Sequence, residues 1–190
     1  LEIPIVSGLS PDNHPVQILS DIFTIEEIKK KNISKLSLCW IGDCNNVLNS
    51  LVEASIKFKF KLSIASPKKY GPNKNILSLI KKKTTKIKFF SDPRKAINDA
   101  DVVFADKFLS LNDKVDKKQK LKEFKKYQIN KNLIKSAKKN YIFLHCLPAS
   151  RGKEVTSEII DGKNSVVWQQ AINRYHVQKS ILLYCLGKLR

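Results

Sequence analysis

One stretch of the sequence, FLHCLPASRGKEV at residues 143–155, joins an apolar run to side chains that could take part in chemistry. His145 and Cys146 supply an imidazole and a thiol, which can transfer protons or act as nucleophiles. Leu147 and Pro148 then end the apolar run. A cysteine after a strand is more often a small core residue than a reactive thiol. The stretch therefore indicates a site only if other polar groups join it.

Polar side chains follow several other apolar runs in the same way. They are Gly42–Asp43–Cys44–Asn45–Asn46, then Asp106 and Ser110, and finally Asn173 and Arg174. Each group alone would also suit a turn, because Asp, Asn and Gly are ordinary loop residues. If the runs are parallel strands, however, their carboxyl ends meet at one edge of a sheet. The pattern then predicts one small-molecule site built from all these groups.

The apolar runs that must position these residues predict a sheet of six strands, at 35–42, 60–67, 86–90, 101–106, 140–146 and 165–170. Segments with the period of a helix lie between them, at 45–58, 73–83, 93–100 and 130–139. In the first of these, one face carries Val47, Leu48, Leu51, Val52 and Ser55. Alternating strands and helices predict an α/β domain with a parallel sheet and helices on both faces.

Two more helices are expected outside the sheet. Residues 10–28 offer Ser10 or Asp12 as N-caps, followed by an apolar stripe through Val16, Leu19 and Phe23. On the other face of the same helix lie His14, Gln17 and Asp21. Near the end of the chain a second stripe is formed by Val177, Ile181, Tyr184 and Cys185. We expect each stripe to need a partner other than the sheet.

The net charge of this 190-residue chain is +19, which raises the question of nucleic-acid binding. Only four of the 36 basic residues are arginine, however, and arginine is the residue favoured for base readout and bidentate phosphate contacts. The lysines occur in runs such as IKKKN, IKKKTTK and KKQKLKEFKK, which we interpret as solvated helix faces. We therefore expect no nucleic-acid partner.

Other classes of protein are disfavoured on similar grounds. No apolar run approaches the roughly 18 residues of a membrane span, so we expect no membrane partner. The cysteines, Cys39, Cys44, Cys146 and Cys185, lack metal-ligand spacing, and we interpret them as free thiols of a cytoplasmic protein. The first strand leads into G-D-C-N-N-V instead of G-x-G-x-x-G, which argues against a dinucleotide site.

Taken together, the motifs resemble the ornithine carbamoyltransferase family. The segments that carry the resemblance are IPIVSGLSPDNHPVQILSD, WIGDCNNVLNS, DVVFADKFLSLNDK, FLHCLPASRGKEVTSEIIDG and SVVWQQAINRYHVQKSIL, in this order along essentially the whole chain. H-P-x-Q is shared by carbamoyltransferases generally. H-C-L-P together with G-D-x-N-N points to the ornithine branch.

The resemblance implies a fold and an activity. The fold would be a Rossmann-like carbamoyltransferase domain with two connecting helices. The activity would be transfer of the carbamoyl group from carbamoyl phosphate to L-ornithine, giving L-citrulline and phosphate, a step of arginine biosynthesis or urea-cycle type. The family works as a trimer, and no metal or organic cofactor is required. Two alternatives stay open: a carbamoyltransferase for another amine, such as putrescine or an acylated ornithine, and a non-catalytic basic binding domain.

The resemblance also implies roles for individual residues. Carbamoyl phosphate would be bound by His14, Gln17, Cys146, Leu147 and Arg174. Ornithine would be bound by Asn46, Asp106, Ser110 and Leu111. Catalysis would depend on Cys146, Asp106 and His14. His145, His176 and Cys185 keep a structural interpretation.

The chemistry explains why such groups are needed. An alkyl amine with a pKa near 10.4 is neutral in roughly one molecule in a thousand at pH 7, so populating the nucleophile costs roughly 4 kcal/mol. A desolvated site that accepts the proton lowers this cost. Cys146 and Asp106 are the candidate acceptors, and the sequence leaves open which of them takes the proton. His14, Gln17 and Arg174 suit stabilisation of the oxyanion and the phosphate.

The chain departs from the family pattern at three points. Where the family usually has S-M-G, this chain has Ser110–Leu111–Asn112; where it has E-x-E-N-R, the acidic positions are Gln170 and Ile172. The family's phosphate-binding S-T-R-T-R motif does not occur in the sequence. We therefore expect a connecting segment at 1–34, an ornithine-binding domain at 35–170 and a C-terminal helix at 171–190 that packs on an absent carbamoyl-phosphate half. Alone, such a chain is expected to be inactive.

Overall fold

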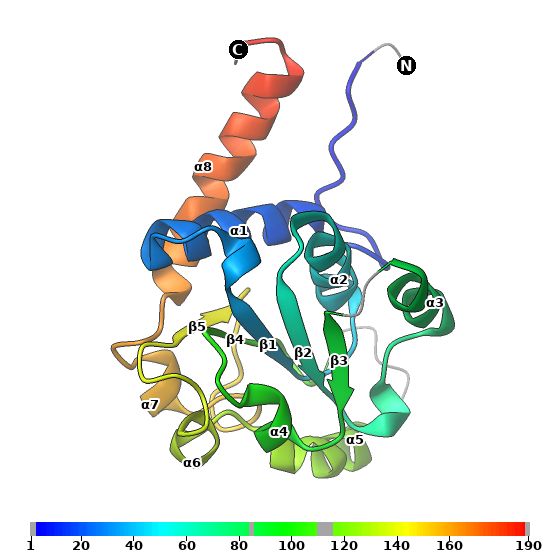
Figure 1. Cartoon of the computed structure of the whole chain (residues 1–190), viewed down its shortest axis with the longest axis vertical. Coiled ribbons are helices and arrows are strands. Elements are labelled where there is room, and N and C mark those ends of the chain that lie inside the picture. Colours follow the sequence, from blue (N-terminus) through cyan, green and yellow to red (C-terminus); the bar gives the residue numbers. More distant parts are fainter. Residues whose placement is uncertain (1–2, 84–85, 110–115, 189–190) are drawn as a thin grey trace.

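The five strands of the computed structural model form one parallel sheet in the order β3–β2–β1–β4–β5 (Figure 1). The structure describes residues 3–83, 86–109 and 116–188. The strands are β1 (Ser37–Ile41), β2 (Lys61–Ala65), β3 (Ile87–Phe90), β4 (Val102–Ala105) and β5 (Ile142–His145). This order reverses direction between β1 and β4, which makes the carboxyl ends of these two strands the expected place for a ligand. The expected parallel α/β sheet is confirmed.

Helices cover both faces of the sheet, as the alternating pattern predicted (Figure 1). One face packs against α1 (Pro15–Lys29), α2 (Asn46–Phe58) and α3 (Lys74–Lys83). The other packs against α4 (Pro93–Ile97), α5 (Lys117–Phe124), α6 (Lys131–Ile134) and α7 (Ser157–Ile160). Short 3₁₀ turns occur at Ile33–Lys35, Lys68–Tyr70 and Lys125–Tyr127. The predicted buried face of α2 is confirmed, since all five of its residues are buried.

The sixth predicted strand, at 165–170, is wrong. Only Ser165 pairs with the sheet, through a single parallel bridge to Phe143, and the helix α8 (Val167–Cys185) begins two residues later. The short apolar run with two adjacent valines suggested a strand, but the amide of Gln170 already donates to the carbonyl of Val166 at 2.8 Å, which is a helical bond. The C-terminal helix therefore begins before the expected boundary at residue 171.

The helix α1 begins differently from the prediction. His14 precedes its first residue, Pro15, and provides no side-chain cap, so neither Ser10 nor Asp12 has the expected role. Ser10 instead closes the preceding turn, where its hydroxyl accepts hydrogen bonds from the amides of Asp12 at 3.3 Å and Asn13 at 2.9 Å. Proline suits the first helical turn because that position has no need of an amide donor.

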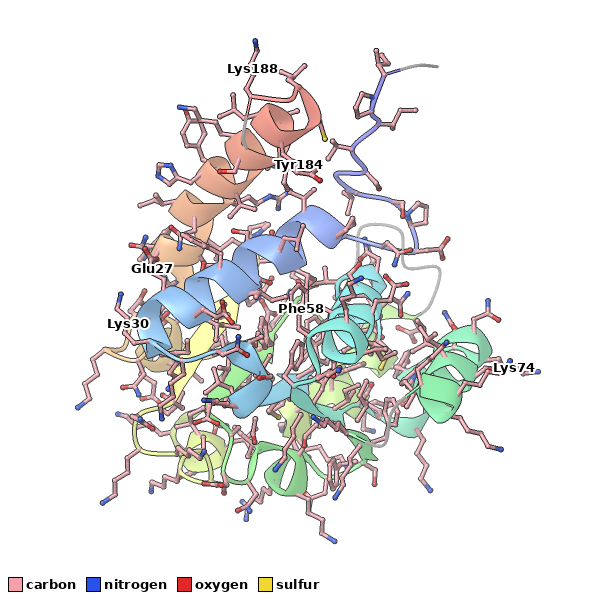
Figure 2. The ribbon with its side chains drawn as sticks, turned by 45° about the horizontal axis from the view of Figure 1, so that its top comes forward. Glu27, Lys30, Phe58, Lys74, Tyr184 and Lys188 are labelled. Carbon is pink, nitrogen blue, oxygen red and sulfur yellow. The ribbon has the colours of Figure 1, made fainter. Side chains whose placement is uncertain are left out.

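Helices α1 and α8 leave an apolar groove between them. Val16 is buried, but Leu19 and Phe23 are 41% and 47% exposed. The groove has a volume of about 450 Å³ and is lined by Leu19, Phe23, His176, Val177, Ser180, Ile181 and Tyr184. Beyond the body of the domain, α8 continues alone (Figures 1 and 2). Most of the two predicted apolar stripes thus line one groove, in which Leu19 and Phe23 of α1 face Val177, Ile181 and Tyr184 of α8.

Most lysines follow the prediction of solvated faces: Lys30, Lys74 and Lys188 project from three separate elements (Figure 2). Lys120 in α5 is an exception, because it is 2% exposed and donates from Nζ to Asp43 Oδ2. Its ammonium also lies 5.2 Å from the ring centroid of Tyr70. This buried ion pair fixes α5 to the turn that follows β1. Among the described residues, no helix is both long and apolar enough to cross a membrane.

Candidate functional site

The turn between β1 and α2 brings polar side chains to the point where the strand order reverses. Gly42 makes this turn with φ of 154°, a conformation that other residues rarely adopt. Asn45 then caps α2, because its Oδ1 accepts from the amides of Val47 and Leu48 at 3.1 and 3.2 Å. Its Nδ2 donates to Asp106 Oδ2 at 2.6 Å. Asn45 thus links the start of α2 to the end of β4.

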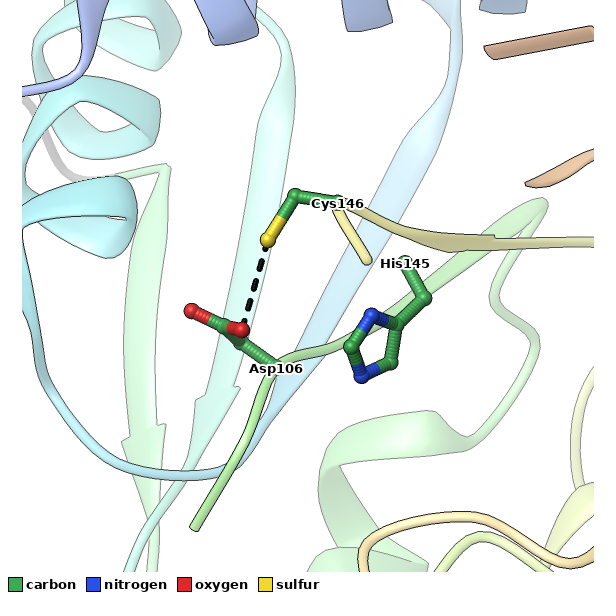
Figure 3. Close-up of side chains that lie close together, drawn as sticks. All are labelled: Asp106, His145 and Cys146. Atoms are coloured by element: carbon green, nitrogen blue, oxygen red, sulfur yellow. Dashed lines mark hydrogen bonds between the residues drawn. The ribbon is translucent and has the colours of Figure 1, made fainter. Parts of the chain in front are cut away.

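Asp106 and Cys146 meet at the carboxyl ends of β4 and β5 (Figure 3). The thiol of Cys146 donates to Asp106 Oδ1 at 3.3 Å. Burial, and then the negative charge of Asp106, hold the pKa of Cys146 well above its usual value, because both disfavour the thiolate. At neutral pH the pair is therefore a neutral thiol beside a carboxylate, and Cys146 is not a resting thiolate nucleophile.

His14, Gln17 and Arg174 form a second cluster, contributed by the start of α1 and the second turn of α8. Arg174 Nη1 donates to Gln17 Oε1 and lies 3.3 Å from His14 Nε2. Burial, and then the charge of Arg174, lower the pKa of His14, so its imidazole is neutral at pH 7. The cluster thus carries one positive charge and several hydrogen-bonding groups, which suits an anionic ligand.

Gln17 and Arg174 of one cluster and Cys146 of the other line one pocket. Its volume is about 130 Å³, and it is lined by Gln17, His145, Cys146, Leu147, Gln170, Ala171 and Arg174. Leu147, which joins the two clusters, has φ of 55° and is followed by a cis bond to Pro148. A leucine in the left-handed region is uncommon, and such residues cluster at functional sites.

Most residues expected at the site lie around this pocket or beside it. Asn46 is held further out by a hydrogen bond from its Nδ2 to the carbonyl of Ser10 at 2.8 Å. Ser110 and Leu111 lie outside the described residues. Asn45 belonged to the polar group expected after the first strand, but it was given no role of its own. Gln170 was not expected at the site, because it stood inside a segment interpreted as a strand.

One group of side chains at the pocket could in principle hold a metal ion. Asp106, His145 and Cys146 each place one potential ligand atom within 4.8 Å of the others. His145 Nδ1, however, accepts from the amide of Leu147 at 2.9 Å, and its Nε2 lies 3.4 Å from Glu154 Oε1. With both imidazole nitrogens facing protein groups, His145 keeps its expected structural role. Asp106 and Cys146 then offer two ligands, fewer than zinc sites in proteins have.

The fold and the pocket together define a Rossmann-like α/β domain with a small polar pocket between α1, α8 and the carboxyl end of β5. Residues 34–185 match the sequence model of the Asp/Orn-binding domain of aspartate/ornithine carbamoyltransferases. The chain is 40% identical over 186 residues to the ornithine carbamoyltransferase of Archaeoglobus fulgidus, covering 98% of this chain and 60% of that protein. It is 43% identical over 185 residues to that of Rhodopseudomonas palustris, covering 97% and 59%.

Solved structures agree with these sequence relatives. Ornithine carbamoyltransferase from Pyrococcus furiosus superimposes with a TM-score of 0.91 at 38% identity, covering 100% of this chain and 61% of that one. The anabolic enzyme from Campylobacter jejuni gives 0.91 at 35% identity, with 98% and 63% covered. The chain therefore belongs to the aspartate/ornithine carbamoyltransferase family. It spans about 60% of the length of the curated relatives that it matches.

Proposed function

We propose that the protein, at the full length of its relatives, transfers the carbamoyl group of carbamoyl phosphate to the side-chain amine of L-ornithine, giving L-citrulline and phosphate. One observation carries this proposal: Gln17 and Arg174 of the first cluster line the same small pocket as Cys146, which is hydrogen-bonded to Asp106. The first suits an anion and the second suits an ammonium group. The names of the relatives support ornithine as the acceptor.

In the proposed reaction the neutral amine nitrogen attacks the carbamoyl carbon. A carbon–nitrogen bond forms, the bond from that carbon to the phosphate oxygen breaks, and the nitrogen loses a proton as phosphate departs. Arg174 neutralises charge on the phosphate. Neutral His14 and the amide of Gln17 hydrogen-bond the carbamoyl group and the oxygen on which negative charge develops.

On the amine side, Asp106 attracts the ammonium form of ornithine. Asn45 and Cys146 both donate hydrogen bonds to Asp106. Since the thiol of Cys146 is protonated at neutral pH, we assign the acceptor role to Asp106 and a hydrogen-bonding role to Cys146. Asn46, Ser110 and Leu111 remain proposed contacts to ornithine, and Leu147 a proposed contact to carbamoyl phosphate.

We further propose that the groove between α1 and α8 receives the remainder of a full-length chain. The groove is apolar and exposed, and the relatives are longer than this chain. Contiguous exposed apolar surface next to polar residues marks interaction sites. Trimerisation and the division into segments 1–34, 35–170 and 171–190 belong to the same proposal. The four free thiols support a reducing compartment, the cytoplasm.

The test is ureido-product formation from carbamoyl phosphate with ornithine, an acylated ornithine, putrescine or aspartate in parallel. It compares residues 1–190 with a full-length protein that includes an upstream phosphate-binding half. We expect citrulline from the full-length protein only. Turnover by residues 1–190 alone would refute the expected inactivity, and preference for putrescine or an acylated ornithine would reassign the acceptor. If neither protein forms a ureido product, the proposed reaction is contradicted.

A further inference from the structure

A buried carboxylate lies behind the pocket and contacts both of its glutamine side chains. Asp21, in the middle of α1, is 1% exposed. Its Oδ1 accepts from Gln17 Nε2 at 2.8 Å and from Gln170 Nε2 at 2.7 Å. Burying a carboxyl group is costly, so packing alone does not account for an aspartate at this position. A carboxylate in this place therefore calls for an explanation.

The far ends of the two glutamine side chains hold groups that border the pocket. Gln17 Oε1 accepts from Arg174 Nη1, and Gln170 Oε1 accepts from the amide of His145 at 3.0 Å. Five residues thus form one continuous chain of hydrogen bonds, from Arg174 through Gln17, Asp21 and Gln170 to His145. It crosses from α8 to α1, returns to α8 and ends on β5.

The direction of every bond in this chain follows from donor and acceptor chemistry. A guanidinium and a backbone amide only donate, and Oδ1 of Asp21, which both glutamines contact, can accept whether or not Oδ2 carries a proton. A glutamine side chain has a donating end and an accepting end that it can exchange by rotation. With Asp21 accepting, Gln17 and Gln170 must both turn their oxygens toward the pocket. If Asp21 did not accept, the two glutamine side chains would be fixed at their oxygen ends alone, and their amide nitrogens would lose their shared buried acceptor.

We propose that Asp21 is a positioning residue, which fixes the orientation of Gln17 and Gln170 and through them places Arg174 and the backbone of His145 at the anion pocket. The proposal rests on the proposed function only in naming the anion as carbamoyl phosphate. The hydrogen-bond chain itself does not depend on that reaction. It assigns the orientation of the pocket to a residue that does not line it.

Two substitutions of Asp21 separate the accepting oxygen from the shape of the side chain. Asp21→Asn keeps an oxygen that can accept from both glutamines, whereas Asp21→Leu has a similar shape and accepts nothing. The control is Asp101→Asn. Asp101 is also buried and hydrogen-bonded, but it lies beside the amino end of β1, where it accepts from the amide of Ser37.

The first measurement is hydrogen exchange by mass spectrometry on the full-length protein without ligand, comparing segment 143–147 with segment 102–105. We expect Asp21→Leu to accelerate exchange at 143–147 by about tenfold or more and to leave 102–105 unchanged. Asp21→Asn and Asp101→Asn should match the wild type at 143–147. Equal protection there in Asp21→Leu and the wild type would overturn the proposal, as would equal loss in Asp21→Asn and Asp21→Leu.

The second measurement is the dissociation constant for inorganic phosphate, which should rise about tenfold or more in Asp21→Leu and stay near the wild-type value in Asp21→Asn. An unchanged constant in Asp21→Leu would overturn the link to the pocket. Should the wild type itself bind no phosphate and form no citrulline, the proposed function fails, while the exchange result still decides the role of Asp21.

A third variant covers the case in which Asp21→Leu does not fold. In Gln170→Glu the new carboxylate can still accept from His145 but cannot donate to Asp21 unless the pair shares a proton. The charged and titratable groups around Asp21 are His14, Arg174, Asp106 and Cys146, and all stay unchanged. Relative to the wild type, phosphate affinity should fall as pH rises and the pair loses its proton. A ratio that is constant between pH 5 and 9 would overturn the proposal.

Discussion

Cys146 and Asp106 show how strongly one neighbour can set the chemistry of a side chain. The sequence places a thiol and a carboxylate at two strand ends 40 positions apart, and it leaves open which of them takes a proton. The structure brings them into hydrogen-bond contact and raises the pKa of Cys146 through burial and the charge of Asp106. The thiol therefore acts as a donor, and the carboxylate remains the group able to accept.

This arrangement predicts how Cys146 reacts with iodoacetamide. Asp106→Asn should lower the pKa of Cys146, because it removes a negative charge next to the thiolate, and should speed alkylation at pH 8 about tenfold. The rate is measured by mass spectrometry of the peptide that contains Cys146. Cys44 is an internal control, because the pKa of its thiol is raised to about 12 chiefly by burial. An equal rate at Cys146 in both proteins would contradict the assigned role of Asp106.

Asp21 predicts a dependence of stability on pH. Burial raises its pKa from 3.8 to about 7, so the folded state holds the proton more tightly than the unfolded state does. Its contribution is fully present below about pH 4 and is lost as pH rises through about 7. Over this range wild-type stability should fall, relative to Asp21→Asn, by on the order of 4 kcal/mol. Urea unfolding of both proteins at several pH values measures this difference in stability. Parallel curves of unfolding free energy against pH would contradict the raised pKa of Asp21.

Among the secondary-structure elements, the N-terminus of α2 combines a structural and a functional role in one residue. Asn45 caps the helix through its oxygen and donates to Asp106 through its nitrogen. The two roles use different atoms of one amide group. A substitution that changes only the nitrogen can therefore separate them.

Asn45→Asp should keep the cap and lose the donor. Aspartate caps helices as well as asparagine does, so at a pH low enough to protonate one of the two carboxyl groups the free energy of unfolding should change by less than about 1 kcal/mol. Its second oxygen would face Asp106 and repel it, so the KM for ornithine should rise about tenfold or more at pH 8, with phosphate affinity unchanged. Asn45→Ala is the matched variant that loses both roles and about 1 kcal/mol of stability. Wild-type ornithine kinetics in Asn45→Asp would exclude a contribution of Asn45 to the site.

The strands and helices differ in how well the sequence predicted them. Five strands were found because short, largely apolar runs between turn residues have few other stable arrangements. The run at 165–170 looked the same, but its residues enter a helix that packs on α1 through Gln170 and Asn173. This packing joins segments almost 150 residues apart, and local periodicity carries no information on it.

The candidate site was predictable to the extent that it depends on strand ends. Residues that directly follow β4 and β5, such as Asp106 and Cys146, were found from the sheet alone. The roles of His14, Gln17 and Arg174 came instead from the family resemblance, because helices α1 and α8 meet only in three dimensions. Asp21 was placed correctly beside Gln17 on one helix face, but its contact with Gln170 depends on the packing of α8.

For the whole molecule, the net charge of +19 makes a separate prediction. Lys30, Lys74 and Lys188 lie on separate elements, which is not the arrangement of a single track for a phosphate backbone (Figure 2). In filter binding with single-stranded RNA, micromolar protein should therefore not saturate the RNA in about 0.15 M salt. A nucleic-acid-binding domain would saturate the RNA under these conditions, and its affinity would fall steeply with salt. Saturable binding of this kind would favour the alternative of a basic binding domain.

The long helix α8 is hydrogen-bonded to α1 near its N-terminal end, so a tilt about this attachment moves its far end the most. Gln170 and Asn173 attach it to α1, Arg174 lies one residue beyond, and Tyr184 lies in the groove far along the same rod. At about 1.5 Å per residue, Tyr184 is roughly 16 Å from Asn173 and Arg174 about 1.5 Å. A sideways swing of about 3 Å at Tyr184 would thus move the backbone of Arg174 by only about 0.3 Å. The helix can adjust to whatever fills the groove while the guanidinium at the pocket stays in register.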